Sequence, residues 1–263
     1  MIDALLALPL WALAVVLNIW LMGFSLAGLY VLRRWVMPRL KINTEAALFF
    51  GAAVMQSAMV LYGLVAALTA VNVWQHHVQV SDIVSNEATS IGGLWRDLDG
   101  YPQPARGAMQ EVLRGYTEQI IHEAWPMQQQ GQVPHQGVEW MKRFQSQLFA
   151  FEPSTEGQKI LYGETLSAYN RLTQARRARL DAVNTGLPGV MWIVLLPGAM
   201  GCLLLSLLFP IEDVRYQATL VTCLSGFVAM VLFVIISLDH PFRGWMAIPA
   251  DSYQLVYDQM MRK

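Results

Sequence analysis

The sequence predicts an all-helical integral membrane protein with four membrane-spanning helices, and three observations support this fold class. Hydrophobic residues make up 55% of the chain and charged residues only 14%, a composition typical of membrane proteins. The apolar residues are gathered in four runs, and each run exceeds the about 20 helical residues that cross a hydrocarbon core. The polar remainder has helical rather than strand periodicity.

Each apolar run is free of charge between its flanking positions. The runs cover residues 5–32, 46–73, 187–209 and 216–238. A charge at the centre of a bilayer costs at least about 2.5 kcal/mol, and hydrocarbon offers no partner for backbone groups, so uncharged helices are expected. The first run is too long for a cleavable signal peptide and lacks a preceding basic region, so we expect it to remain as a span.

The polar segment between the second and third runs is expected to form a helical extramembrane domain that continues the membrane helices. One amphipathic helix should run up to Trp125 and end at Pro126 and the glutamines that follow. A Thr155 cap is expected to begin a long helix toward the third span. The expected parts are residues 1–73 (two spans), 74–186 (the domain), 187–238 (two spans) and 239–263 (a C-terminal segment).

Basic residues leave the orientation in the membrane open. The loop after the first span carries Arg33, Arg34, Arg39 and Lys41, which favours a cytoplasmic loop and an external domain. The domain side is also basic, however, and the total count favours neither orientation.

The sequence lacks the patterns of an enzyme or a metal site. The pairs His76-His77 and His122-Glu123 form no HExxH motif, and no second cluster has the spacing of metal ligands. Serines in the spans have no acid or base partner at a recognisable spacing. We therefore expect no catalytic residues, no metal, no cofactor and no nucleic-acid partner.

The second run is rich in small residues, which allows two interpretations. Small side chains let helices approach closely, so this helix could lie inside a tightly packed bundle. Alternatively, one face could line an apolar pore that gates by dewetting. The residues of that predicted pore face are Gln56, Val60, Gly63, Ala67 and Ala70.

Arg176, Arg177 and Arg179 form a basic run shortly before the third span. Such a run is typical of a patch that binds lipid headgroups. If it is repeated around an oligomer, it would instead form a ring of positive charge that concentrates anions near a pore mouth.

Several segments together resemble the bestrophin-like membrane protein family, and they cover most of the chain from the second span onward. The matching features are Trp74 and Asn86–Trp95 with its Glu87, Glu123–Met127 with its Trp125, Arg177–Leu180, Gly186–Pro188 with Trp192, and the closing Asp239, Pro241, Phe242 and Gly244.

The resemblance implies a homopentamer around one axial pore, with inorganic ions and membrane lipids as partners, in a bacterial plasma membrane. Bestrophins are ion channels, and we expect anion conduction in preference to cation conduction. Calcium gating is not expected, because Asp239, Asp251 and Asp258 are scattered rather than clustered. The alternative is a non-conducting sensor or scaffold that acts through the helical domain.

The closing motif, LDHPFRG, follows the fourth span directly. Pro241 is expected to stop the helix, Phe242 to anchor in the apolar layer, and Arg243 to reach water. The resemblance further implies that this turn docks the segment from Trp245 to Tyr257 against the helical domain near Glu87. We also expect Arg243 to contact Glu87, because both are charges at a membrane boundary on the same side.

Overall fold

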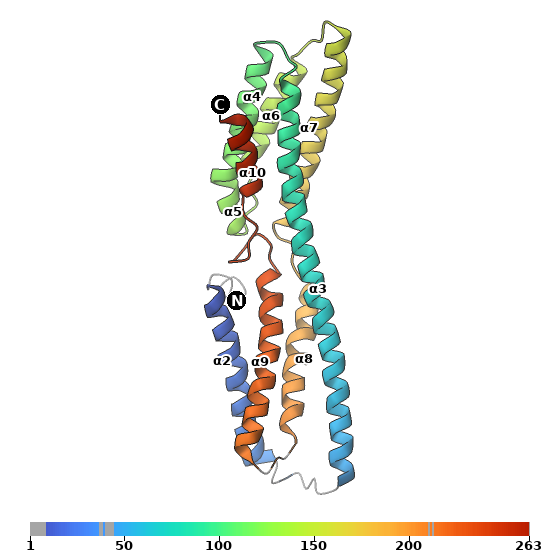
Figure 1. The fold of residues 1–263 in the computed structure, drawn as a ribbon, viewed down its shortest axis with the longest axis vertical. Helices are drawn as coiled ribbons and strands as arrows, with labels where there is room; N and C mark the ends of the chain where they lie inside the picture. The colour runs from blue at the N-terminus through green and yellow to red at the C-terminus, as the bar shows by residue number, and fades with distance from the viewer. Residues whose placement is uncertain (1–8, 37–38, 40–44, 210, 212, 263) are drawn as a thin grey trace. The chain divides into compact units, whose positions relative to one another are not determined.

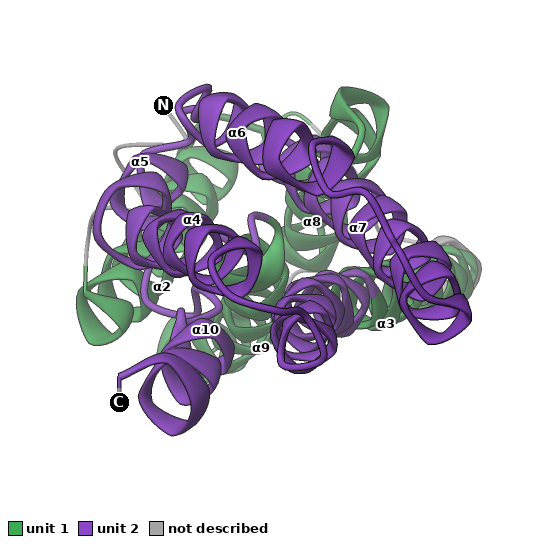
Figure 2. Ribbon diagram, turned by 90° about the horizontal axis from the view of Figure 1, so that it is seen from above, with its two compact units in different colours: residues 1–75, 186–239 green, residues 76–185, 240–263 purple. Residues whose placement is uncertain are grey.

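The computed structural model describes residues 9–36, 39, 45–209, 211 and 213–262, and regular secondary structure within these ranges is helical. The chain divides into two compact units (Figure 2). Unit 1 consists of residues 1–75 and 186–239, and unit 2 of residues 76–185 and 240–263. The C-terminal residues therefore belong to the same compact unit as most of the polar segment.

The structure confirms the four predicted spans (Figure 1). Residues 5–8 of the first predicted span lie outside the described residues. Within unit 1, α2 packs chiefly against α9, and α8 contacts both. The spans are α2 (Leu10–Val31, continued by the π-helical turn Leu32–Val36), the first part of α3 (Glu45–Leu98), α8 (Gly189–Leu207) and α9 (Val214–Leu238).

Polar contacts join the helices of unit 1 at several points, and two of them involve α9 with α2 and with the start of α8. The buried hydroxyl oxygens of Ser25 on α2 and Ser225 on α9 lie 2.7 Å apart. Within a bilayer, moving apolar side chains from lipid into a helix interface gains little free energy, so hydrogen bonds between helices help to hold them together. At the C-terminal end of α9, the Asp239 carboxylate accepts a 2.6 Å hydrogen bond from the backbone N–H of Leu187, just before α8. Asp239 thus ties the end of α9 to the start of α8.

Unit 2 is built from the second part of α3 and several shorter helices. Apolar faces of these helices form one continuous core. The predicted cap is confirmed, because the Thr155 hydroxyl accepts a 3.2 Å hydrogen bond from the N–H of Gln158. The helices are α4 (Ala105–Gln119), the π-helical turn Ile120–Ala124, α5 (Trp125–Gln129), α6 (Gly137–Phe149), α7 (Glu156–Ala182) and α10 (Asp251–Val256), which continues as the π-helical turn Tyr257–Met261.

The helix ends within the predicted glutamine run, but the prediction for Pro126 is wrong. Pro126 does not end the helix, because it occupies the first turn of α5, where a missing backbone N–H costs little. The helix continues to Gln129, and Gly131 turns the chain away with φ of 74°. This left-handed conformation suits glycine, which lacks the Cβ that makes it costly in other residues.

Helix α3 is continuous over 54 residues, from the second span into the helical domain. A bilayer crossing needs only about 20 helical residues, so the remainder extends beyond the hydrocarbon core. The domain therefore continues the second span as predicted. At its other end, α7 stops at Ala182 and α8 begins at Gly189, so the chain breaks its helix before the third span.

Candidate functional site

The predicted pore face runs along the membrane-spanning part of α3. Its residues are spaced alternately four and three apart, so they share one side of the helix. In the single chain, Gln56, Val60, Gly63 and Ala67 are exposed and Ala70 is half-buried. The lower part of this face, from Gly63 to Ala70, borders an apolar groove of about 360 Å³ that α8 and α9 complete.

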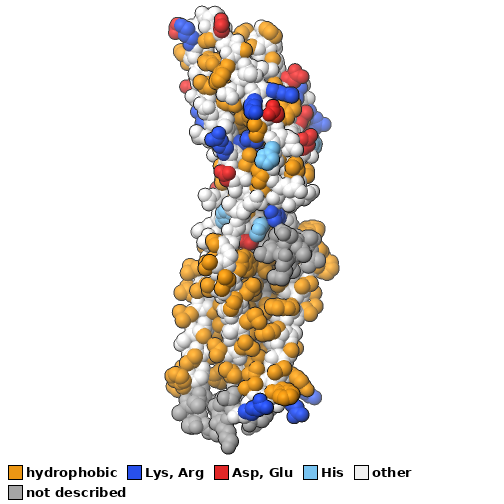
Figure 3. Space-filling model, turned by 180° about the vertical axis from the view of Figure 1, so that it is seen from behind, with side chains coloured by type: hydrophobic (Ala, Val, Ile, Leu, Met, Phe, Trp, Pro, Cys, Tyr) orange, Lys and Arg blue, Asp and Glu red, His pale blue; other side chains and the backbone are white. Residues whose placement is uncertain are grey.

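The span of α3 is poorly covered by the rest of its own chain. Only 11% of its most apolar window is buried, compared with 39% for α9. Leu61, Leu64 and Leu68 are each more than half exposed. Close packing is made within the chain on one face only, where Ala66 and Val73 are buried against α8 and Thr69 is 2% exposed. The rest of its surface is left for lipid or for other subunits, and Figure 3 shows how widely apolar side chains cover the visible face of the spans.

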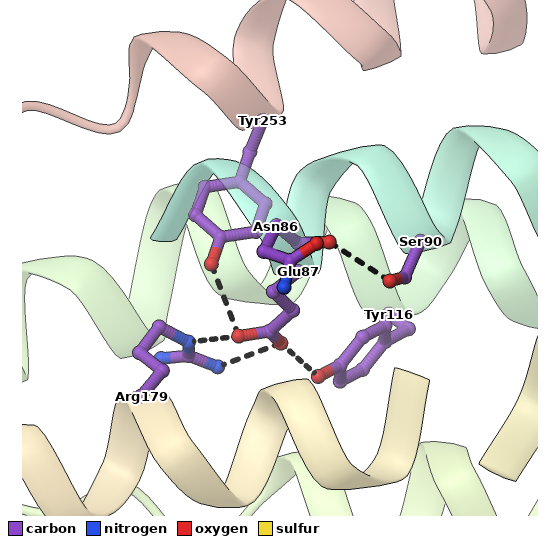
Figure 4. Close-up of polar contacts among 6 residues, drawn as sticks. All are labelled: Asn86, Glu87, Ser90, Tyr116, Arg179 and Tyr253. Carbon is purple, nitrogen blue, oxygen red and sulfur yellow. Dashed lines mark hydrogen bonds and ion pairs between the residues drawn. The ribbon is translucent and has the colours of Figure 1, made fainter. Parts of the chain in front are cut away.

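Unit 2 contains a buried ion pair between Glu87 on α3 and Arg179 on α7 (Figure 4). The Nε of Arg179 lies 2.5 Å from Oε2 of Glu87, and its Nη2 lies 3.2 Å from Oε1. Glu87 is 0% exposed and Arg179 is 1% exposed. A fork of two parallel hydrogen bonds is the strongest geometry for a guanidinium and a carboxylate.

Two tyrosines complete the surroundings of the Glu87 carboxylate. Tyr116 on α4 donates its hydroxyl proton to Oε1 over 2.7 Å, and Tyr253 on α10 donates to Oε2 over 3.1 Å. The carboxylate thus joins four helices of unit 2. The expected contact between Arg243 and Glu87 is wrong, because Arg179, Tyr116 and Tyr253 fill the acceptor sites of this carboxylate.

The surroundings of the cluster fix its protonation state. Burial, and next the negative charge of Glu87, raise the pKa of Tyr116 and Tyr253 well above the ordinary 10.0, so both stay neutral donors. Burial alone would lower the pKa of Arg179, but the adjacent Glu87 outweighs it and keeps the pKa above the ordinary 12.5. The two tyrosines therefore stay neutral donors and Arg179 stays a cation.

The three arginines of the predicted basic patch do not form one. Arg179 is buried and its charge is compensated by Glu87. Arg176 is half-buried, and its guanidinium approaches Gly137 on α6. Only Arg177 is exposed. The prediction failed because consecutive positions on a helix point about 100° apart, so a run in sequence is not a patch in space.

The closing motif anchors in the helical domain rather than in the apolar layer. Phe242 is 1% exposed, and its ring lies 5.5 Å from that of Trp125 in an edge-to-face arrangement. The Trp125 indole N–H donates a 3.2 Å hydrogen bond to the carbonyl of Ile248, and Tyr253 packs against the same indole. The expectation for Phe242 was wrong because this aromatic cluster offers it a more specific partner than lipid.

The turn around Arg243 is held by backbone groups and an amide. The N–H of Ile248 donates to the carbonyl of Pro241 over 2.9 Å, and Gly244 has φ of 80°. The Arg243 guanidinium donates a 3.1 Å hydrogen bond to the side chain of Asn184. It also covers Gly131 so closely that a Cβ there would overlap it. The motif therefore fixes the path of the chain from Pro241 toward α10.

Other residues singled out from the sequence make local contacts or lie at the surface. Pro188 precedes the first turn of α8, and Trp74 is 54% exposed on α3. His76 pairs with the Thr185 hydroxyl at 3.0 Å, and His77 with the carbonyl of Met246 at 2.8 Å. Among the described residues, no group of histidines, cysteines or carboxylates is arranged to hold a metal ion.

The C-terminal segment reaches Glu87 through Tyr253, as expected, but sequence reasoning missed Arg179 and Tyr116 as partners of this carboxylate. A signal was present on α3, where Glu87 falls in a stripe of buried residues at steps of three and four. These are Val80, Val84, Ile91, Leu94 and Leu98. On α7, Arg179 lies seven residues after the buried Leu172, which places it on the same side of its helix. A charge on a buried stripe requires a buried partner.

The comparisons with known proteins agree with this architecture. A family model described as "Bestrophin-like domain" matches residues 19–253. A bacterial bestrophin homologue from Klebsiella pneumoniae is 11% identical over 95% of this chain and 99% of its own, with a TM-score of 0.70. A solved structure described only as a membrane protein variant is 10% identical with the same coverage and TM-score. No curated protein matches the sequence.

Proposed function

We propose that this protein is an ion channel formed by several copies of the chain, because the chain belongs to the bestrophin-like family of membrane proteins. Bestrophins are channels, and the fold is shared with a bacterial bestrophin homologue. The proposed assembly is a homopentamer around one axial pore, in a bacterial plasma membrane. The permeating species are inorganic ions, with anions preferred over cations.

The observation that carries this proposal is the exposed polar and small face of α3. Gln56 is exposed in the single chain and lies within a membrane span. An amide that faced hydrocarbon without a partner would cost several kcal/mol, about 4–8 kcal/mol on the cyclohexane scale. Placing it toward a water-filled pore or another subunit removes this cost. Gly63 and Ala67 lie on the same face of α3 as Gln56, and their small side chains would leave space for ions along the proposed pore axis.

The preference for anions rests on the helical domain. Arg177 is exposed on α7 and would be repeated in every subunit. Positive charge repeated around an axis raises the local concentration of anions. Arg179 contributes nothing to this effect, because Glu87 compensates its charge.

The test is ion flux through the purified protein in liposomes, with opposed chloride and sodium gradients and the reversal potential as readout. A reversal potential near that of chloride supports the proposal. A reversal near that of sodium contradicts the anion preference but keeps the channel. Silence from an intact oligomer contradicts the channel and favours the non-conducting sensor or scaffold.

A matched pair of variants tests the pore face. An added Cβ at Gly63 on α3 or at Gly23 on α2 would meet nothing within 4 Å, so the two positions have the same room for the first atom of a side chain. We expect Gly63→Leu to reduce flux at least tenfold, because it narrows the pore, and Gly23→Leu to leave flux within twofold. Equal flux in both variants would remove Gly63 from the pore.

A further inference from the structure

A polar pocket of about 300 Å³ lies in unit 2, in the groove between α3 and α7. This volume is roughly at the lower end of the range found for pockets that bind small molecules. Its lining residues are Asn86, Ser90, Arg171, Gln174, Ala175 and Ala178.

The lining combines one cation with neutral polar groups. Arg171 is its charged residue, and no carboxylate belongs to the lining. Among the described residues, the side chains of Asn86, Arg171 and Gln174 make no side-chain hydrogen bond, so their N–H groups are available to a ligand. Asp97 lies outside the lining but near Arg171: burial raises the pKa of Asp97, and the charge of Arg171 offsets part of that rise. The Ser90 hydroxyl already donates to the carbonyl of Asn86 over 2.8 Å and leaves its lone pairs free (Figure 4).

The pocket walls are held at a fixed spacing by the buried ion pair described above. Glu87 directly follows Asn86 on α3, and Arg179 directly follows Ala178 on α7, so the pair joins the two helices beside the pocket. The small side chains of Ala175 and Ala178 leave the groove between α3 and α7 open. A site whose walls are already positioned loses less entropy when a ligand binds.

We infer that this pocket binds a small soluble anion with a carboxylate or phosphate group. The planar guanidinium of Arg171 presents a fork of donors that matches two oxygens of such a group. Asn86 and Gln174 supply amide donors for further oxygens of the same ligand. This site is separate from ion conduction, and each subunit carries its own copy.

The test is titration calorimetry of the purified full-length protein in detergent with inorganic phosphate, at constant chloride and ionic strength. We expect saturable binding at one site per chain. Arg171→Gln should weaken it at least tenfold. Arg177→Gln is the matched control, because it removes the same charge from an exposed position of α7 outside the pocket. It should change the affinity less than twofold.

Two results would overturn the inference. Equal weakening in both variants would mean that phosphate responds to general positive charge on α7. Absence of saturable binding to the intact protein would mean that the pocket is closed by a neighbouring subunit or is too open to hold an anion. A thermal unfolding midpoint for each variant confirms that the compared chains are folded. Binding is measured without ion flux, so the outcome is independent of channel activity.

Discussion

Replacing Glu87 with glutamine tests directly how much the charge of Glu87 stabilises the helical domain. The substitution keeps the shape of the side chain but removes its charge, and it leaves Arg179 as a cation that is 1% exposed. The hydroxyls of Tyr116 and Tyr253 and the Nε and Nη2 of Arg179 all donate to this carboxylate. An amide offers one oxygen in place of two, so at least one of these donors loses its acceptor.

The expected loss of stability is large. Removing one partner of a buried ion pair costs about 3–5 kcal/mol, because the remaining charge is buried without compensation. For a protein of this size, a loss of 1 kcal/mol lowers the unfolding midpoint by about 2–4 °C. Glu87→Gln should therefore lower the thermal midpoint of the helical domain by about 6–20 °C.

The assay is thermal unfolding in a mild detergent, followed by tryptophan fluorescence, because Trp95 and Trp125 lie in the core of unit 2. Asp258→Asn is the control, since it breaks the ion pair with Arg262, whose side chains are 57% and 73% exposed. Exposed pairs contribute about 0–1 kcal/mol, so this variant should unfold within a few degrees of the parent.

The double variant Glu87→Gln with Arg179→Gln separates charge from packing. It removes both charges, so it should unfold at a higher temperature than Glu87→Gln alone. The reasoning would be refuted if the double variant lost the sum of the two single losses. It would also be refuted if Glu87→Gln and Asp258→Asn unfolded at the same temperature.

Two further predictions concern alkaline pH and the turn after α5. In the folded chain, the pKa values of Tyr116 and Tyr253 are raised well above 10.0. Their contribution to the free energy of unfolding is therefore fully present below pH 10. It falls above pH 10, because there only the unfolded chain loses these protons. Tyr253→Phe should reduce this alkaline slope in unfolding midpoints measured from pH 8 to 11, and an unchanged slope would contradict the assignment. Gly131→Ala should cost about 1–3 kcal/mol, because φ is 74° and the new Cβ would overlap Arg243. Denaturant titration should find Gly157→Ala, whose Cβ meets nothing within 4 Å, no less stable than the parent.

The spans could be predicted from sequence because hydrocarbon leaves the backbone few options. Without water to satisfy N–H and C=O groups, an uncharged apolar run must be helical. The cap at Thr155 was equally local, since it depends on a hydroxyl three residues before the N–H of Gln158. Rules that act within a few residues therefore predicted the start of α7 as well as the four membrane helices.

The partners of Glu87 could not be predicted from the same rules. Arg179 lies 92 residues further along the chain and Tyr253 lies 166 residues further. Periodicity places each residue on a buried stripe, but it does not say which stripes face one another. Arg243 was equally plausible as a partner by charge alone, and only the packing of α7 against α3 excludes it.

Phe242 illustrates the same limit for apolar contacts. Hydrophobicity favours burial of this ring but is non-directional, so lipid and a protein core are equivalent destinations from sequence alone. The edge-to-face contact with Trp125, more than a hundred residues earlier, decides the outcome.

The carboxylate of Glu87 also has a consequence for biosynthesis. Its donors arrive in the order in which the ribosome makes them, first Tyr116, then Arg179 and last Tyr253. Domains fold as the chain emerges, so the helical domain acquires its ion pair well before its final hydrogen bond. Until residue 253 has been synthesised, the indole of Trp125 also lacks its packing partner on α10. Chains cut short before this point are therefore left with an incomplete core in the helical domain.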